Sequence, residues 1–236
     1  MILKNLAQKA ITVKIKNQAI QLLPQRCIYW PAERTLLLSD VHLGKSSHFR
    51  KAGLPVPGTI AFADLGRIGN LIKELCVARV IFLGDLFHSD INREWLLLEN
   101  FMEDYSSCEF ILIKGNHDIL PEAVYRQSRL KIVEEEMVIF PFLLTHHPPE
   151  TRPVNNDLYT LCGHIHPAVL LKGKGNQQQK LACFYFGLHY GILPAFGKFT
   201  GFHKIKVSAT DSVFGVLPEK VVCLQLGVNC QLAEAM

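Results

Sequence analysis

The chain has 236 residues, of which 49% are hydrophobic and 19% are charged, and this is enough material to bury one substantial core. The composition excludes a disordered, collagen-like or coiled-coil protein. The formal charge of +4 is compatible with a phosphate-bearing partner without requiring one.

Membrane and secretion signals are not found in the sequence. The longest apolar stretch, residues 137–144, includes Pro141 and is far shorter than the roughly 20 residues that cross a bilayer, so we expect a soluble protein with no membrane partner. Lys and Asn interrupt each apolar run near the start, so no signal-peptide core is predicted. The seven cysteines form no C-x-x-C pair and lie mostly in apolar runs, which predicts reduced core thiols and a cytoplasmic location.

The predicted elements begin with a β-hairpin at 10–23 and a strand at 27–30. Strands and helices then alternate, with helices predicted at 59–76 and 92–105 from their apolar spacing. Short, nearly continuous hydrophobic runs predict strands that are buried on both faces, at 35–38, 80–83, 110–113, 142–145 and 158–162. The polar stretch 172–180 predicts a long hairpin loop, and later strands are predicted at 183–187, 203–207 and 221–225. This order predicts an α/β fold in which two packed mixed β-sheets carry helices on their outer faces, as one domain over residues 1–236.

Each of the five buried strands runs directly into a polar cluster at its carboxyl end. In sheets of this kind ligands bind beyond the carboxyl ends of the strands, so the clusters are expected to meet at one rim. The clusters are Asp40-Val41-His42, Gly84-Asp85, Gly115-Asn116-His117-Asp118, His146-His147 and Gly163-His164-Ile165-His166.

The residue types in these clusters indicate a metal site. Two Asp, one Asn and four His provide oxygen and nitrogen ligands without a thiolate, which suits a mid-series divalent ion. Seven side chains are too many for one ion and suit two, with Asp85 as the natural bridge. Residues i and i+2 of an extended chain point the same way, so Asp40 with His42, and His164 with His166, can share a cavity. Two ions and two carboxylates leave a positive site, for which phosphate is the expected guest.

The series D-x-H, G-D, G-N-H-D, H and G-H-x-H at residues 38–167 resembles the calcineurin-like metallophosphoesterase superfamily. This resemblance implies an αββα sandwich and two bound divalent ions. We expect the ions to be Mn²⁺, with Fe, Zn, Ni and Mg as alternatives. The resemblance assigns Asp85 to both ions and His117 to catalysis beside the leaving oxygen. His146 is chosen over His147 because it directly follows the strand. The implied first-metal ligands are Asp40, His42, Asp85 and His166, and the second-metal ligands are Asp85, Asn116, His146 and His164. We expect Asp118 to hold the His117 imidazole in one tautomer or to stabilise its protonated form.

Two further stretches, at 40–58 and 193–201, are similar to the bacterial ligase-associated DNA-damage-response endonuclease branch of that superfamily. No acidic residue lies between Asp40 and Asp64, whereas Lys45, Arg50 and Lys51 do, so this loop is expected to bind substrate phosphates unless it is merely solvated. Of the other histidines, His48 and His203 are expected at the surface, and His88 and His189 are candidates to reach the rim.

The sequence therefore predicts a hydrolase in which a two-metal-activated water cleaves phosphodiester bonds, acting on DNA ends or other nucleic acid in ligase-associated repair. Repair-complex proteins and a second copy of the chain are possible partners. Two alternatives stay open at this point: a nucleotide or nucleotide-lipid pyrophosphatase, and a non-catalytic scaffold on the same fold.

Overall fold

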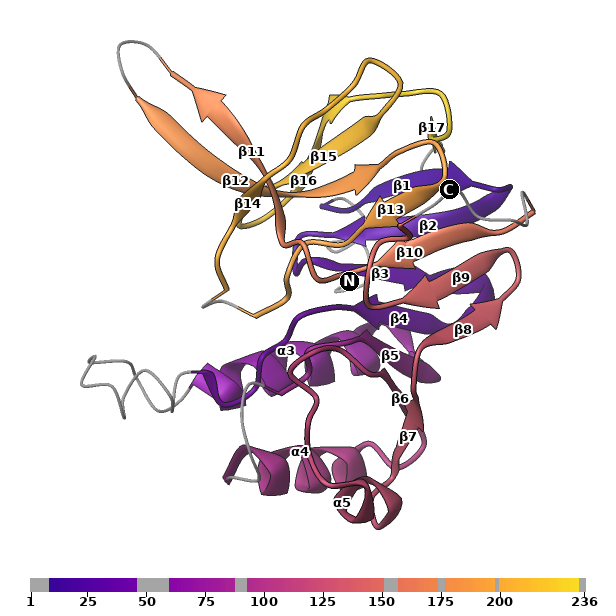
Figure 1. Cartoon of the computed structure of the whole chain (residues 1–236), viewed down its shortest axis with the longest axis vertical. Coiled ribbons are helices and arrows are strands. Elements are labelled where there is room, and N and C mark those ends of the chain that lie inside the picture. Colours follow the sequence, from indigo (N-terminus) through magenta and orange to yellow (C-terminus); the bar gives the residue numbers. More distant parts are fainter. Residues whose placement is uncertain are drawn as a thin grey trace.

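A computed structural model describes residues 9–45, 60–87, 93–150, 157–173, 177–197 and 200–233. Two β-sheets stack face to face, with helices α3, α4 and α5 below the first of them (Figure 1). None of the helices in these ranges is both long and apolar enough to cross a membrane.

The first sheet has eight strands and is mixed. Its second half, from β4 to β7, is parallel, and its first half is antiparallel. In spatial order its strands are β17 (Gln231–Leu232), β1 (Ile11–Ile15), β2 (Gln18–Leu23), β3 (Cys27–Trp30), β4 (Thr35–Leu38), β5 (Arg79–Leu83), β6 (Glu109–Ile113) and β7 (Leu130–Val133).

The second sheet has nine strands, among which β9 and β10, and β10 and β13, are parallel neighbours. Its main path runs through β14 (His203–Lys204), β11 (Pro167–Lys172), β12 (Gln178–Phe186), β13 (Tyr190–Ile192), β10 (Tyr159–Cys162), β9 (Phe142–Thr145) and β8 (Glu136–Ile139), and β15 (Ser212–Val216) pairs with β12 and with β16 (Val221–Gln225).

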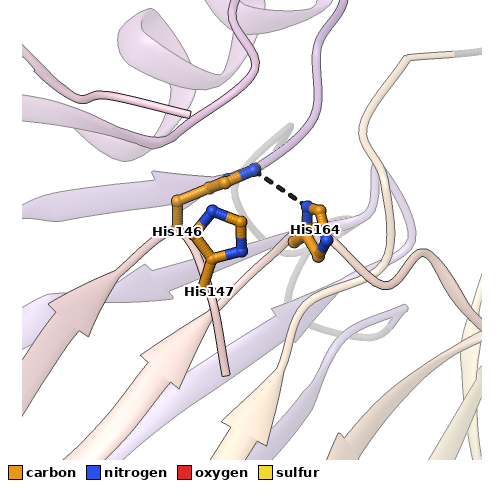
Figure 2. A group of neighbouring side chains, drawn as sticks. All are labelled: His146, His147 and His164. Atoms are coloured by element: carbon orange, nitrogen blue, oxygen red, sulfur yellow. Dashed lines mark hydrogen bonds between the residues drawn. The ribbon is translucent and has the colours of Figure 1, made fainter. Parts of the chain in front are cut away.

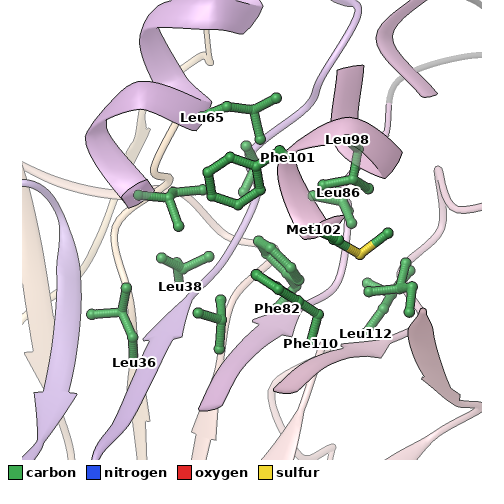
Figure 3. Packing of buried hydrophobic residues seen from close by; sticks show 14 of the residues in the cluster. Leu36, Leu38, Leu65, Phe82, Leu86, Leu98, Phe101, Met102, Phe110 and Leu112 are labelled. Atoms are coloured by element: carbon green, nitrogen blue, oxygen red, sulfur yellow. The ribbon is translucent and has the colours of Figure 1, made fainter. Parts of the chain in front are cut away.

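The alternation of side chains along β5 shows how the layers are held together. Val80 and Phe82 belong to the core between the first sheet and the helices, whereas Ile81 and Leu83 belong to the core between the two sheets. Successive residues of a strand point to opposite faces, so a strand that is apolar throughout must be covered on both. Figure 3 shows the helix-side core, where Phe82 and Phe110 lie against Phe101 and Met102 of α4.

The helices that form this cover are α3 (Ile60–Leu75), α4 (Arg93–Asp104) and the short α5 (Glu122–Arg126); a 3₁₀ turn, η1, spans Pro31–Glu33. The predicted α/β fold of two packed mixed sheets is confirmed. Within the described ranges the α-helices lie on the outer face of the first sheet, and none of them covers the second sheet (Figure 1).

Several predicted boundaries move. The N-terminal hairpin turns at Lys16 and Asn17, which both have positive φ, as the expected tight turn requires. The predicted loop at 172–180 is shorter, because β12 already begins at Gln178 and pairs with β11. Of the strand predicted at 203–207, only His203 and Lys204 are paired. Five of the seven cysteines are buried free thiols, as expected for core residues, and Cys76 and Cys223 are exposed.

Candidate metal centre

The first-sheet part of the site lies at the carboxyl ends of three parallel neighbours. Asp40 follows β4, Asp85 follows β5, and Asn116 and His117 follow β6. Hydrogen bonds continue this pairing beyond the strands: the His42 N–H donates to the Asp85 carbonyl at 2.9 Å, and the His117 N–H donates to Oδ1 of Asp85 at 2.9 Å. The three loops therefore form one edge.

The second sheet adds histidines to the same edge. His146 follows β9, and His164 and His166 follow the parallel strand β10. The two loops are joined by a hydrogen bond from the Gly163 N–H to the His146 carbonyl at 3.0 Å. The sheets are joined by the His164 N–H, which donates to Oδ2 of Asp40 at 3.0 Å. Clusters that are more than 100 residues apart in the chain thus form a single site.

Asp85 lies between two groups of histidines. Its Oδ2 is 3.8 Å from Nε2 of His42 and 4.0 Å from Nε2 of His117. Its Oδ1 is 3.5 Å from Nε2 of His146. Each oxygen of the Asp85 carboxylate therefore faces a different group of imidazole nitrogens.

The possible ligand atoms form three overlapping sets, and within each set all atoms lie within 4.8 Å of one another. The mixed oxygen and nitrogen donors and their spacing fit divalent ions of the middle transition series. The sets are Asp40, His42 and His166; Asp40, Asp85 and His146; and His146, His147 and His164. Six of the seven predicted ligands are therefore brought together, and the seventh, Asn116, lines a cavity of about 630 Å³ together with His146 and His147.

Either of the adjacent residues His146 and His147 could be the metal ligand that follows β9. Figure 2 shows both of them beside His164. His146 is buried, and its Nδ1 lies 2.8 Å from the Leu83 carbonyl oxygen. Because a carbonyl oxygen only accepts, Nδ1 carries the proton, and the lone pair of Nε2 faces Asp85 and His164. This geometry favours His146 as a ligand. The ring of His147 is only 4.4 Å from that of His164, so His147 lies at the border of the site.

Backbone conformation marks the same residues. Five of the candidate ligands have φ between 51° and 68°, in the left-handed region that residues other than glycine seldom adopt: Asp40, His42, Asp85, His164 and His166. Such conformations persist only where the surrounding structure enforces them, and they cluster at functional sites.

Two glycines allow the loops to approach one another. Gly84 has φ of 77°, and a Cβ placed there would lie 2.1 Å from Nδ1 of His146. A Cβ on Gly163 would lie 2.5 Å from Cβ of Ser39 and 2.7 Å from Oδ2 of Asp40. Both positions therefore require glycine, because any side chain would collide with the neighbouring loop.

A sequence profile described as calcineurin-like phosphoesterase matches residues 33–172, which is more than half of the chain. The chain belongs to the calcineurin-like phosphoesterase family. The protein is therefore a hydrolase of phosphoesters that depends on divalent metal ions, and its clustered carboxylates and imidazoles fit such ions.

Solved structures of phosphoesterases and a nuclease resemble this phosphoesterase. The Pseudomonas putida nuclease MPE has 29% identity and a TM-score of 0.73, over 91% of this chain and 100% of the nuclease chain. YfcE, a phosphoesterase from E. coli, has 16% identity and a TM-score of 0.44, over 77% and 86% of the two chains. A predicted phosphoesterase from Streptococcus pneumoniae TIGR4 has 13% identity and a TM-score of 0.36, over 80% and 95%. Among curated proteins, no sequence matches this chain.

The protonation states in the phosphoesterase site suit metal ligation. Burial of Asp40 opposes its ionisation, but hydrogen bonding and charge from His166, with His146 and Ser39, lower the pKa of its carboxyl below the usual value. Burial, followed by the neighbouring imidazoles, lowers the pKa of His164 and of His147. Ionised Asp and neutral His are the forms that bind a metal ion.

Asp118 makes contacts that differ from those expected. Its Oδ1 accepts a hydrogen bond from the Phe87 N–H at 3.1 Å, and its Oδ2 accepts one from the Gly115 N–H at 2.9 Å. The side chain is buried, whereas the His117 side chain is 48% exposed, because the two neighbours point to different sides of the turn. Asp118 thus ties the loop after β5 to the loop after β6, and these contacts suit a positioning residue. Burial raises its pKa to about 6.

Among the predicted substrate-binding residues, Lys45 is at the site. It is half-buried, three residues after His42; burial lowers its pKa, and the charges of Asp85 and Asp40 act in the opposite direction. Arg50 and Lys51 lie outside the described residues, as do His48 and His88.

The suggestion that His189 reaches the rim is wrong. It precedes β13, and its carbonyl accepts from the Thr160 N–H at the start of β10, whereas the ligands follow the end of that strand. It lines a separate cavity with Tyr159 and Leu188.

A supporting segment at residues 195–197 was not predicted. The Phe196 N–H donates to the Ser39 carbonyl at 2.9 Å, and the Gly197 N–H donates to the Asp40 carbonyl at 3.2 Å. Arg67 of α3 donates to the Phe196 carbonyl at 2.7 Å and to Asp64 at 2.9 Å, and its guanidinium lies 4.0 Å from the centre of the Phe196 ring. Residues 193–201 carry the family resemblance, but no physical signal in the sequence indicates this contact, because Arg67 and Phe196 are 129 residues apart.

Proposed function

We propose that this protein is a two-metal phosphodiesterase that cleaves DNA. The observation that carries the proposal is the position of Asp85, whose two oxygens face different histidines. Two ions, for which Mn²⁺ fits the mixed donor set, would supply an activated water and neutralise charge on the phosphoryl oxygens.

The proposed ligands divide between the two sides of Asp85. On one side, Oδ1 of Asp40 lies 3.2 Å from Nε2 of His166, and His42 completes the set. On the other side, Nε2 of His146 lies 3.2 Å from Nδ1 of His164. Asn116, exposed at the same cavity, adds a carboxamide oxygen to this second side.

His117 is the proposed proton donor to the leaving oxygen. Its ring centre is 5.4 Å from that of His42, and its side chain is about half exposed, so it borders the metal ligands while facing the space that a substrate enters. An imidazole can donate a proton near neutral pH, which a leaving alkoxide requires. Lys45, on the first-sheet side, would attract the substrate phosphate.

DNA as substrate is supported by similarity to a nuclease. The match to nuclease MPE covers the whole of that chain, at 29% identity. The resemblance of residues 40–58 and 193–201 to the ligase-associated endonuclease branch supports a role in processing damaged DNA, together with repair proteins, in the cytoplasm.

The test combines a small diester with DNA. We expect the Mn²⁺-loaded protein to hydrolyse bis-p-nitrophenyl phosphate and to cleave duplex DNA, and Asp85→Asn and His117→Ala each to lower kcat at least 100-fold. His189→Ala, a change of the same type away from the metal centre, should retain activity. Full turnover by either site variant would refute the proposal, and hydrolysis of a nucleotide diphosphate without cleavage of DNA would replace DNA as substrate.

A further inference from the structure

The excess of positive over negative charge arises in residues 158–210, which contain no acidic residue. This segment contains six of the 25 Lys and Arg residues and none of the 21 Asp and Glu residues. The rest of the chain therefore carries a small negative excess, and the formal charge of +4 arises from this segment. A local concentration of one sign of charge attracts a partner of the opposite sign more effectively than the net charge suggests.

Part of this segment folds into a three-stranded unit, which we call the basic arm: residues 167–172, 178–182 and 203–206. Strand β11 pairs with β12 on one side and with β14 on the other. Figure 1 shows the β11–β12 hairpin extending away from the rest of the second sheet.

The basic arm begins at the metal centre. Pro167, the first residue of β11, directly follows the candidate ligand His166. The His203 N–H donates a hydrogen bond to the His166 carbonyl at 3.0 Å, so β14 also begins beside this ligand. The six residues of β11 extend about 20 Å from that point, at roughly 3.3 Å per residue. Anything bound along the arm is led toward the metal ligands.

The strand register places lysines on one face of the arm. Lys204 is paired with Ala168 and Lys180 with Leu170, and paired residues, like residues i and i+2, share a face. Lys180 and Lys204 therefore share a face and are exposed, and Lys206, which follows β14, is exposed as well. In the ranges that the structure covers, no carboxylate lies within 4.0 Å of their amines.

We propose that the basic arm binds the phosphate backbone of duplex DNA and directs the duplex into the metal centre. This proposal rests on the proposed nuclease function and names the surface that holds the substrate. Lysine amines neutralise phosphates without regard to sequence, and the exposed amides of Gln178 and Gln179 add donors for phosphate oxygens. An arm of about 20 Å corresponds to about six base pairs at 3.4 Å per step.

The test neutralises the arm and leaves the metal centre intact. The variant carries Lys180→Gln, Lys204→Gln and Lys206→Gln, and the matched control carries Lys14→Gln, Lys16→Gln and Lys220→Gln, three lysines exposed elsewhere. Binding of a 20-base-pair duplex to catalytically inactive Asp85→Asn protein is measured over a range of salt concentrations. The slope of log K against log salt is negative, and each lost phosphate contact makes it less steep by about 0.9. The slope of the arm variant should therefore be less steep by about 2–3, and the slope of the control should be unchanged.

Activity assays on a small diester and on DNA distinguish failure of the arm proposal from failure of the proposed nuclease function. With Asp85 intact, the arm variant should hydrolyse bis-p-nitrophenyl phosphate at the rate of the unchanged protein while cleaving DNA at least 10-fold more slowly at low DNA concentration. A salt slope equal to that of the unchanged protein, or an equal loss in the control, would overturn the arm proposal even if the small diester is hydrolysed. Failure to hydrolyse any diester, with the salt slope changed as expected, would overturn the proposed function and retain the arm as a DNA-binding surface.

Discussion

The backbone N–H of His164 donates a hydrogen bond to the carboxylate of Asp40, and this contact joins the second sheet to the first at the metal centre. The same carboxylate lies 3.2 Å from Nε2 of His166. Asp40 therefore fixes the loop after β10, and its carboxylate lies together with ring nitrogens of His42 and His166 in a set that could hold an ion.

Replacement of Asp40 should remove one ion. Asp40→Asn keeps the shape of the side chain but removes the negative charge, so we expect the Mn²⁺ content to fall from about two ions per chain to about one, and kcat to fall at least 100-fold. Elemental analysis after dialysis measures the metal content. Glu122→Gln, which changes an exposed carboxylate on α5, is the matched control and should keep both ions.

Gly84 should tolerate no side chain. In Gly84→Ala the new Cβ would collide with the His146 ring and the backbone would keep a φ of 77°, so we expect a loss of more than about 1 kcal/mol in the free energy of unfolding, together with weaker metal binding. Gly66→Ala is the control: it lies in α3 with open space around it, and it should be neutral or stabilising by about 0.5–1 kcal/mol. Equal stabilities of the two variants in urea denaturation would contradict the close packing at Gly84.

The Asp118 carboxyl should titrate near pH 6 in the metal-free protein. Its folded-state pKa is raised by burial from 3.8 to about 6, so its favourable contribution to stability is complete below about pH 4 and is lost as the pH rises through 6. The carboxyl ¹³C chemical shift of Asp118, followed by NMR, measures the midpoint directly. A midpoint near 4 without metal would show that the hydrogen bonds from Phe87 and Gly115 outweigh burial.

Arg67 should influence metal binding without contacting the ions. It holds the Phe196 carbonyl, and the Phe196 segment holds the backbone at Ser39 and Asp40, so Arg67→Met should weaken Mn²⁺ affinity by about 10–100-fold, as loss of outer contacts to ligands does. Arg79→Met, which breaks a part-buried ion pair with Glu109 at the opposite end of β5 from Asp85, is the control. Calorimetric titration with Mn²⁺ distinguishes the two, and equal affinities would assign Arg67 a purely structural role.

Much of the fold could be predicted because its central strands are buried on both faces. Strands that are apolar throughout, such as 80–83 and 110–113, are stable only when both of their faces are covered by other apolar layers. The structure buries both faces of these strands. Strand β7 was missed because Lys131 interrupts its apolar run and only Leu130 of its four side chains is fully buried. The strand predicted at 203–207 is only two residues long because pairing with β11 ends at Lys204.

The site could be predicted where the order of the strands determines which residues meet. It could not be predicted where the contacts depend on the direction of a side chain. Polar residues at the ends of parallel neighbours must share an edge, which brought Asp40 beside Asp85 in the first sheet and His146 beside His164 in the second. The direction of Asp118 depends on the turn around it, which residue spacing does not determine. Likewise, the contact of Arg67 with Phe196 appears only when α3 packs beside β4.

The proposed function depends on two ions sharing Asp85, and a crystal of the protein soaked in Mn²⁺ and phosphate would show whether they do. The anomalous difference map should show two Mn²⁺ ions about 3.5–4 Å apart, with one oxygen of Asp85 bound to both ions or its two oxygens divided between them. A single ion, or ions bound away from Asp85, would contradict the claim.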